Sequence, residues 1–314
     1  MLATFLAGLS VPVFSDDTGR GREAGAAFRM GLGARELGMG GGYTALADDA
    51  CAAYVNPAGL VWLERRWFTA TARSMALDRR FYSLGYAQSL GGKKGLMRAG
   101  FSLGWLCAGV DNIDLRDFDG NPAGTLSHWE HNFYFSFAVQ PAPVFSLGMT
   151  AKVLYSRFPD LVDQETDLSA VGFGFDLGMA IRPISSLQIG LSVRDIRSKY
   201  TWDTQDLYEQ GTQTVDQFPW IAVAGLAYRG LGDRLLVALD AEQIEYHPVT
   251  LRAGVEFNVV PGIDVRIGSR DGEWTFGAGF NFSIPVGDVR LDYAFVEDPV
   301  APRPCHVFSW SFLF

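Results

Sequence analysis

Alternation of apolar and polar residues with a period of two is the feature that most constrains this chain. In VTLRAGVEFNV, residues 249–259, every second side chain from Val249 to Val259 is apolar, and Arg252 and Glu256 lie among the polar residues between them. Successive side chains of a β-strand point to opposite faces, so the segment has one apolar and one polar face. WTFGAGFNFSI (274–284) and DVRLDYAFV (288–296) repeat the pattern, and no helical period of 3.6 competes with it.

The same alternation predicts fourteen strands and an all-β fold. The predicted strands are residues 66–75, 80–90, 97–117, 125–140, 144–157, 168–182, 185–197, 219–229, 233–243, 249–259, 262–270, 273–285, 287–297 and 305–314.

The predicted connections alternate in length. Those after even-numbered strands are short and rich in Pro and Gly, such as PAP, PI, GLG and VPG. Those after odd-numbered strands include RFPDLVDQETD, SKYTWDTQDLYEQGTQTVDQF and EDPVAPRP. Tight turns on one side and longer loops on the other are typical of an antiparallel up-and-down barrel in an outer membrane.

Alternation also fits a soluble β-sandwich, but two features favour a membrane. The predicted strands are longer than the five or six residues usual in globular proteins and match the length that crosses a bilayer at a tilt. Aromatic residues lie near strand ends on the predicted lipid face, as expected at headgroup level. These residues are Trp67, Phe81, Trp105, Trp220, Tyr228, Trp274, Tyr293 and Trp310.

The chain ends in CHVFSWSFLF, where Phe308, Trp310, Phe312 and Phe314 share one face. Four aligned aromatic residues on a terminal strand would promote aggregation of a soluble protein. A final strand closing with Phe resembles the signal that outer-membrane barrels present to their assembly machinery. We therefore expect this strand to contact that machinery and outer-membrane lipid, in the outer membrane of a Gram-negative bacterium.

Charge and composition exclude several other classes of function. The net charge of −9 and pI near 5.0 argue against a nucleic-acid partner. The three cysteines are scattered, and the four histidines form no metal-binding motif, so we expect no metal and no cofactor. Ser309 and His306 fall on opposite faces of the last strand and no Gly-x-Ser-x-Gly occurs, so we do not expect an enzyme.

A glycine-rich stretch at residues 37–60 is not a phosphate-binding loop. Neither Gly-x-Gly-x-x-Gly nor Gly-Lys-Ser/Thr aligns on its glycines, and Arg29, Arg35 and Glu36 interrupt the buried strand that such a loop needs before it. Before this stretch, residues 1–15 have the apolar part of a secretory signal without its basic region, which predicts an incomplete signal peptide.

Residues 32–60, LGARELGMGGGYTALADDACAAYVNPAGL, resemble the amino-terminal motif of the PorV/PorQ family of outer-membrane proteins and, more distantly, that of the FadL transporters. The resemblance implies a fourteen-stranded transmembrane barrel (residues 65–314) with an N-terminal plug segment (residues 16–64) inside. The plug-motif residues are Arg35, Gly38, Gly40, Gly42, Asp48, Asp49, Asn56 and Pro57.

The motif suits a segment packed against a barrel wall. Glycine permits close backbone approach, and Asn56 followed by Pro57 can begin a short helix. Asp48 or Asp49 either remains solvated or pairs with a basic group of the lumen. The candidate basic groups are Lys152, Arg194, Arg234, Arg252, Arg266 and Arg290, and Glu256 and Asp292 are also expected to line the lumen, as are Asp240 and Glu242.

Two functions follow from the resemblance. The FadL likeness implies a plugged channel for hydrophobic small molecules, which would capture a ligand on the loop 198–218 and release it when the plug moves or at a strand kink. The aromatic residues of that loop are Tyr200, Trp202, Tyr208, Phe218 and the adjoining Trp220, and the kink glycines are Gly172, Gly174 and Gly178. The PorV/PorQ likeness implies instead a non-transporting accessory that binds components of type IX protein secretion.

Overall fold

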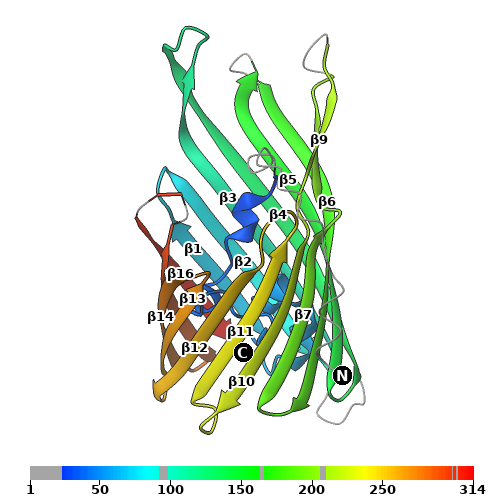
Figure 1. The fold of residues 1–314 in the computed structure, drawn as a ribbon, viewed down its shortest axis with the longest axis vertical. Helices are drawn as coiled ribbons and strands as arrows, with labels where there is room; N and C mark the ends of the chain where they lie inside the picture. Colours follow the sequence, from blue (N-terminus) through cyan, green and yellow to red (C-terminus); the bar gives the residue numbers. More distant parts are fainter. Residues whose placement is uncertain (1–22, 92–97, 163–165, 206–209, 299, 302) are drawn as a thin grey trace.

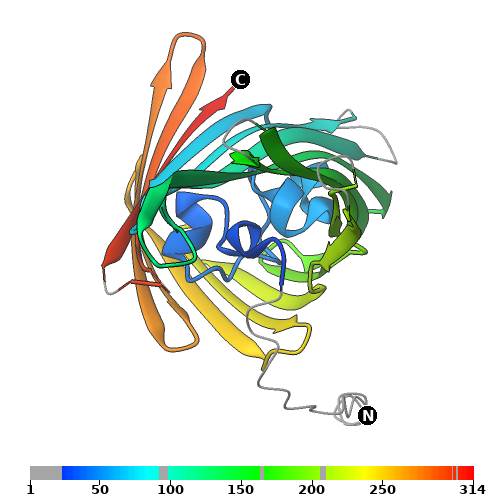
Figure 2. The same cartoon turned by 90° about the horizontal axis from the view of Figure 1, so that it is seen from above.

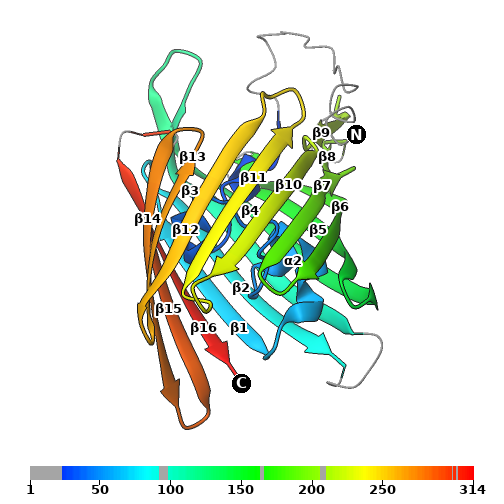
Figure 3. The ribbon, with the colours of Figure 1, turned by 60° about the horizontal axis from the view of Figure 1, so that its bottom comes forward.

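The computed structural model describes residues 23–91, 98–162, 166–205, 210–298, 300–301 and 303–314. Its single sheet has sixteen strands, and all except β8 and β9 form a ring that the pairing of β5 with β6 closes. The result is the predicted fourteen-stranded antiparallel barrel (Figures 1 and 3). The barrel strands are β1 (Trp67–Ser74), β2 (Arg79–Leu90), β3 (Ala99–Arg116), β4 (Pro122–Ala142), β5 (Phe145–Val162), β6 (Thr166–Ile184), β7 (Leu187–Ile196), β10 (Ile221–Gly230), β11 (Leu235–Ile244), β12 (Thr250–Val260), β13 (Ile263–Arg270), β14 (Glu273–Ile284), β15 (Gly287–Glu297) and β16 (Pro304–Leu313).

The structure differs from the prediction at the long-loop end. Strands β3 to β6 are the longest of the barrel, at 18 to 21 residues. Because β5 continues to Val162 and β6 begins at Thr166, most of the loop expected at 157–167 is strand. These strands rise above the rest of the barrel in Figure 1 and change register near Asn112 and Asp160, two non-glycine residues with positive φ. The expected loop 198–218 also contains a hairpin, β8 (Lys199–Asp203) and β9 (Gln213–Gln217).

The outer surface of the barrel is apolar. Phe133 and Phe135 on β4 are about half exposed, and so are Phe308, Trp310 and Phe312 on β16. Such a continuous apolar surface would be unstable in water and matches the lipid-facing band of a membrane barrel. Among the residues that the structure describes, no helix is long and apolar enough to cross a bilayer.

Two aromatic residues predicted to face lipid lie inside instead. Phe81 is fully buried, with the Arg73 guanidinium 5.2 Å from its ring, and Trp67 is 8% exposed. Their outward neighbours are Phe68 and Tyr82, so both faces of β1 and β2 carry aromatic residues and the type of side chain alone does not identify the lipid face. Four of the other predicted residues are exposed on the barrel: Trp220, Tyr228, Trp274 and Trp310.

Residues 23–64, here called the inner segment, lie within the barrel, as Figure 2 shows from above. The segment contains η1 (Ala26–Arg29), α1 (Ala34–Gly38), α2 (Ala52–Val55) and η2 (Pro57–Trp62). Helix α1 packs against β13 to β16, and η2 packs against β2 to β6. The predicted signal peptide, residues 1–15, lies outside the described residues.

Glycines in two neighbouring strands make room for the inner segment. A Cβ atom at Gly148 of β5 would lie 2.4 Å from the backbone nitrogen of Ala58, and one at Gly178 of β6 would lie 2.2 Å from Oδ1 of Asn56. Both distances are shorter than van der Waals contact, so the turn at residues 56–58 reaches the wall because these positions lack side chains.

We predict that Gly148→Ala destabilises the folded protein by about 1–3 kcal/mol, because the added methyl group overlaps backbone atoms that cannot rotate away. The temperature at which the barrel unfolds in detergent measures the effect. Gly85→Ala is the matched control, since its Cβ would lie 3.3 Å from a methyl group of Thr69. Equal unfolding temperatures for the two variants would contradict close packing of the inner segment at Gly148.

Candidate functional site

An ionic network joins the inner segment to the barrel wall at Arg35. From α1, its Nε and Nη2 atoms each donate a 2.8 Å hydrogen bond to Glu256 on β12. Its Nη1 atom donates to Tyr43 at 2.6 Å and to Asp48 at 2.5 Å. Arg35 is 6% exposed, so water screens little of its charge. A bidentate pair of this kind fixes both position and orientation.

The network continues along the wall through Glu256. This carboxylate also accepts from Nε of Arg266 at 2.5 Å, and Arg266 lies 2.8 Å from Asp292. Arg290 donates to Asp292 at 2.9 Å and lies 3.4 Å from Asp264. The structure thus brings together all the predicted lumen residues of strands β12, β13 and β15 except Arg252.

The two acidic residues of the plug motif share Arg35 and Tyr43 and differ in their other partners: Asp49 lies 3.5 Å from Arg35, and Asp48 lies 3.2 Å from the Tyr43 hydroxyl. Asp48 contacts Arg35 and also Arg229 of β10, neither of which was among the predicted candidates. Asp49 accepts from the Tyr43 hydroxyl at 2.6 Å and from the Cys51 amide at 2.8 Å. The expectation for Arg234 is wrong, because this side chain lies at an exposed turn and donates to the carbonyls of residues 258 and 259.

The remaining candidate basic groups form two further clusters. Arg194 and Arg252 both contact Glu242, the former at 3.0 Å. Lys152 lies between Asp176, at 2.7 Å, and Asp195, at 2.8 Å. Separately, Asp240 accepts from the backbone amides of Tyr43 and Thr44 at 3.0 and 2.9 Å, so it holds the inner segment through its backbone.

The glycines and the Asn-Pro pair of the motif also contact the wall. Gly40 has φ 66°, and a Cβ there would lie 2.5 Å from the carbonyl oxygen of Ser269. A Cβ at Gly38 would lie 3.1 Å from the Cα of Gly277, and one at Gly42 would lie 3.4 Å from the carbonyl oxygen of Ala238.

Asn56 caps η2 by accepting from the Ala58 amide at 3.2 Å, with Pro57 at the first helical position. Its side-chain amide donates to the carbonyls of Thr44 and Met179, at 3.0 and 3.1 Å. One side chain therefore caps a helix, ties two parts of the inner segment together and joins them to β6.

Two of the aromatic residues expected to capture a ligand are buried, and Trp202 is half-buried beside Tyr200. Tyr200 and Phe218 are 2% and 6% exposed and contact each other edge to face at 5.1 Å. Gly25 of the inner segment lies against Phe218, so the hairpin covers the start of that segment. Tyr208 lies outside the described residues, and Trp220 is exposed.

The glycines expected to mark a kink allow a close approach of backbone. A Cβ at Gly172 would lie 1.7 Å from the Lys199 carbonyl oxygen, and one at Gly174 would lie 1.9 Å from the Ser198 hydroxyl. Here β6 changes partner from β7 to β8. The bare inner face of β6 therefore accommodates residues 198–199.

A cavity of about 380 Å³ lies between the inner segment and the wall. Its lining includes the tips of the β11–β12, β13–β14 and β15–β16 hairpins, which places it at the long-loop end of the barrel, the external end in proteins of this architecture. At its edge, burial alone would raise the pKa of Asp298, but hydrogen bonds from Arg79 hold that pKa below its ordinary value. Asp298 is thus a charged carboxylate already paired with arginine.

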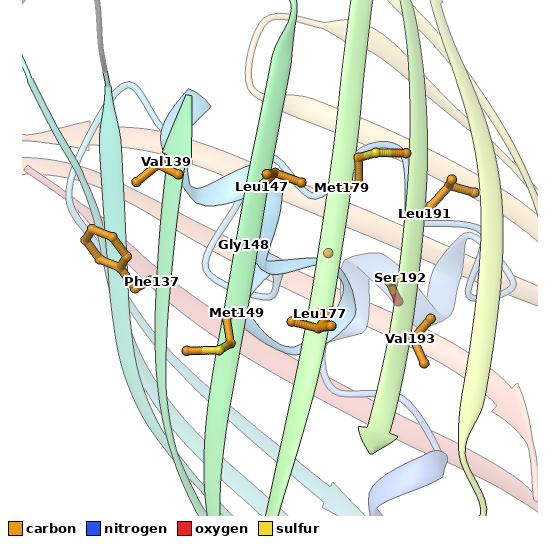
Figure 4. A pocket seen from close by; sticks show the side chains of 11 residues that line it. Phe137, Val139, Leu147, Gly148, Met149, Leu177, Met179, Leu191, Ser192 and Val193 are labelled. Atoms are coloured by element: carbon orange, nitrogen blue, oxygen red, sulfur yellow. The ribbon is translucent and has the colours of Figure 1, made fainter. Parts of the chain in front are cut away.

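A second hollow, of about 430 Å³, lies on the outside of the barrel across β4 to β7. Figure 4 shows its apolar side chains, including Phe137, Met149, Leu177 and Val193. These four side chains are exposed on the outer face, so the hollow belongs to the lipid-facing surface and not to the lumen.

The possible catalytic pair does not meet. Ser309 points inward, where its hydroxyl accepts from the Ala34 amide at 2.9 Å, whereas His306 points outward and lies 2.7 Å from the Tyr293 hydroxyl. Among the described residues, no group of three His, Cys, Asp or Glu side chains has the arrangement of a metal site.

No family model and no curated protein matches the sequence. Solved structures do match the fold. The toluene transporter TbuX of Ralstonia pickettii superposes with a TM-score of 0.63 at 13% identity, over 90% of this chain and 98% of that one. A Pseudomonas aeruginosa FadL homologue gives 0.63 at 12%, and the CymD monoaromatic hydrocarbon channel 0.64 at 12%, each with the same coverage.

These similarities concern the fold. Together with the closed ring of strands and the apolar exterior, they indicate that the barrel spans an outer membrane. A backbone in lipid must pair all its polar groups, and a closed barrel does so. An antiparallel barrel with an even number of strands and an apolar outer band is an outer-membrane structure of Gram-negative bacteria. The chain therefore has the fold of FadL-type outer-membrane barrels.

We predict that Glu256→Gln lowers the free energy of unfolding by about 3–5 kcal/mol, because it leaves the buried guanidinium groups of Arg35 and Arg266 without their shared carboxylate. Denaturant titration of the protein in detergent measures the change. Glu273→Gln, at an exposed end of β14, is the control and should change stability by less than about 0.5 kcal/mol. A similarly small change for Glu256→Gln would show that the network does not hold the inner segment.

Proposed function

We propose that this protein is an outer-membrane channel for hydrophobic small molecules. The observation that carries the proposal is the 380 Å³ cavity between the inner segment and the wall, at the external end of a barrel with the fold of hydrocarbon channels. Its volume lies within the range of small-molecule sites. Apolar molecules entering from outside would reach this cavity first.

The inner segment is the proposed gate. Glu36, Leu37, Gly40 and Gly41 line the cavity, so α1 and the turn after it form one of its walls. Nearly all residues from 32 to 61 are buried, and the segment packs against both halves of the barrel. A molecule in the cavity therefore needs a shift of this segment to move on through the lumen.

An accessory role in type IX secretion, as in PorV and PorQ, is the alternative. The resemblance of residues 32–60 to the motif of that family supports it. TbuX is called a transporter and CymD a channel, which favours transport.

We predict that cells expressing the protein take up labelled toluene faster than cells carrying an empty vector, and that locking the inner segment abolishes the difference. Ala34→Cys combined with Ser309→Cys is a suitable lock, because the 2.9 Å contact between the Ala34 amide and the Ser309 hydroxyl keeps the two Cα atoms within about 7 Å, a separation that a disulfide can bridge. The native cysteines Cys51, Cys107 and Cys305 are replaced by alanine beforehand to prevent other disulfides.

Reductant should restore uptake by the locked variant, and Ala34→Cys alone should behave as the cysteine-free parent. Uptake equal to the empty vector at matched expression would remove the channel proposal. Undiminished uptake by the oxidised double variant would keep the channel but exclude movement of α1 as its gate.

A further inference from the structure

One arginine in the lumen cavity has no acidic partner. Arg73 of β1 lines the cavity and is 5% exposed. Within the described part of the chain, its hydrogen-bond acceptors are the carbonyl oxygens of Met30 and Gly31, at 2.9 to 3.4 Å, and it forms no ion pair. Arginine stays protonated in proteins, so a buried positive charge faces the cavity with no carboxylate in ion-pair contact among the described residues.

The other buried charged groups of the cavity already have partners. Arg194 and Arg252 share Glu242, and Glu36 accepts from the amides of Leu32 and Gly33. The acidic residues at the rim, Asp271, Glu273 and Glu297, are exposed, where water and salt screen their charge. Asp298 is neutralised by Arg79, so the three buried arginines Arg73, Arg194 and Arg252 face the two carboxylates of Glu36 and Glu242. The buried part of the cavity therefore carries one positive charge in excess, and Arg73 is the arginine without a carboxylate in contact.

Unpaired donors mark the same place. The Nε atoms of Arg73, Arg194 and Arg252 are buried without a hydrogen-bond partner in the described residues, and all three side chains line this cavity. These Nε atoms are enclosed by protein, so they show that the neighbouring residues leave part of each guanidinium group unpaired. Three guanidinium groups around one space are suited to an oxyanion.

The cavity also has an apolar lining. The apolar side chains are Ala26, Met30, Leu37, Met75, Ile244 and Val296. An inorganic anion would leave these surfaces facing water, whereas a carboxylate on an apolar body would contact both kinds of surface.

We propose that this cavity binds a small organic anion, a carboxylate carried on an apolar body the size of one aromatic ring or a short alkyl chain. The carboxylate contacts Arg73, and the apolar body lies against the methionine and aliphatic side chains. This assignment rests on the proposed channel function and adds small amphipathic anions to the hydrophobic molecules that the channel would carry.

Equilibrium dialysis of the intact protein in phosphatidylcholine nanodiscs tests the proposal, with labelled benzoate and benzyl alcohol as probes of the same size. Wild-type protein should bind benzoate saturably, one molecule per barrel, and at least about tenfold more tightly than benzyl alcohol. Equal or weaker binding of benzoate would overturn the proposal. Both probes are measured on the wild-type protein, so the result does not depend on whether a variant folds.

Arg73→Gln identifies the residue responsible. It should weaken benzoate binding at least about tenfold and change benzyl alcohol binding by less than about twofold. Arg116→Gln, which removes the same charge from an exposed site, should change neither. Equal loss of both probes in Arg73→Gln would show that Arg73 only supports the turn at Met30 and Gly31, which would overturn the assignment.

Toluene uptake separates this inference from the proposed function. Uptake without benzoate binding refutes the anion site and leaves the channel. Benzoate binding without toluene uptake supports the site and removes the hydrocarbon channel.

Discussion

The structure depends on one constraint: a backbone surrounded by lipid must pair every N–H and C=O group within itself. A sheet of antiparallel strands meets this requirement only when its edges join, and here β1 pairs with β16 along eight residues while β5 pairs with β6. Closure then gives the two faces of each strand different surroundings. Phe308, Trp310 and Phe312 face lipid, and Ser309 and Ser311 face the lumen, where they bond to Thr71 and Thr69.

Closure with fourteen strands creates a second requirement, because about eight strands already enclose a space that wall side chains just fill. The inner segment occupies the remaining space, and its contacts are of two kinds. Glycines such as Gly40, Gly148 and Gly178 allow backbone to meet backbone, and Arg35 joins α1 to β12 through Glu256. Buried charges are tolerated there because each charged group of the network contacts a group of opposite charge. Arg73, which lines the cavity, has no such partner among the described residues.

Much of the fold could be predicted because alternation is a direct consequence of strand geometry. The predicted strands agree with the observed ones to within three residues at each end, except that β5 continues to Val162 instead of ending at residue 157. The hairpin β8–β9 was not predicted because each of its strands has five residues, too few for the alternation to be recognised. Phe218, which packs against Tyr200 of β8, lies after the hairpin and does not extend its pattern. Asp264 could have been predicted to face the lumen, because it lies two residues before Arg266 on the same face of β13. Arg229 could not, because the inward residues before it, Ile221, Val223, Gly225 and Ala227, are apolar or small and show no polar face. Recognition of Phe314 by assembly machinery stays a prediction.

The most direct test of this account is site-directed spin labelling along β12, one residue at a time from Leu251 to Asn258, with the protein in lipid bilayers. The account predicts that collision with oxygen dissolved in lipid rises and falls with a period of two. The maxima should fall at Leu251, Ala253, Val255 and Phe257, and labels at Arg252, Gly254, Glu256 and Asn258 should be shielded from it. Equal accessibility of both sets to a water-soluble relaxation agent would contradict a lipid-facing barrel with a filled lumen.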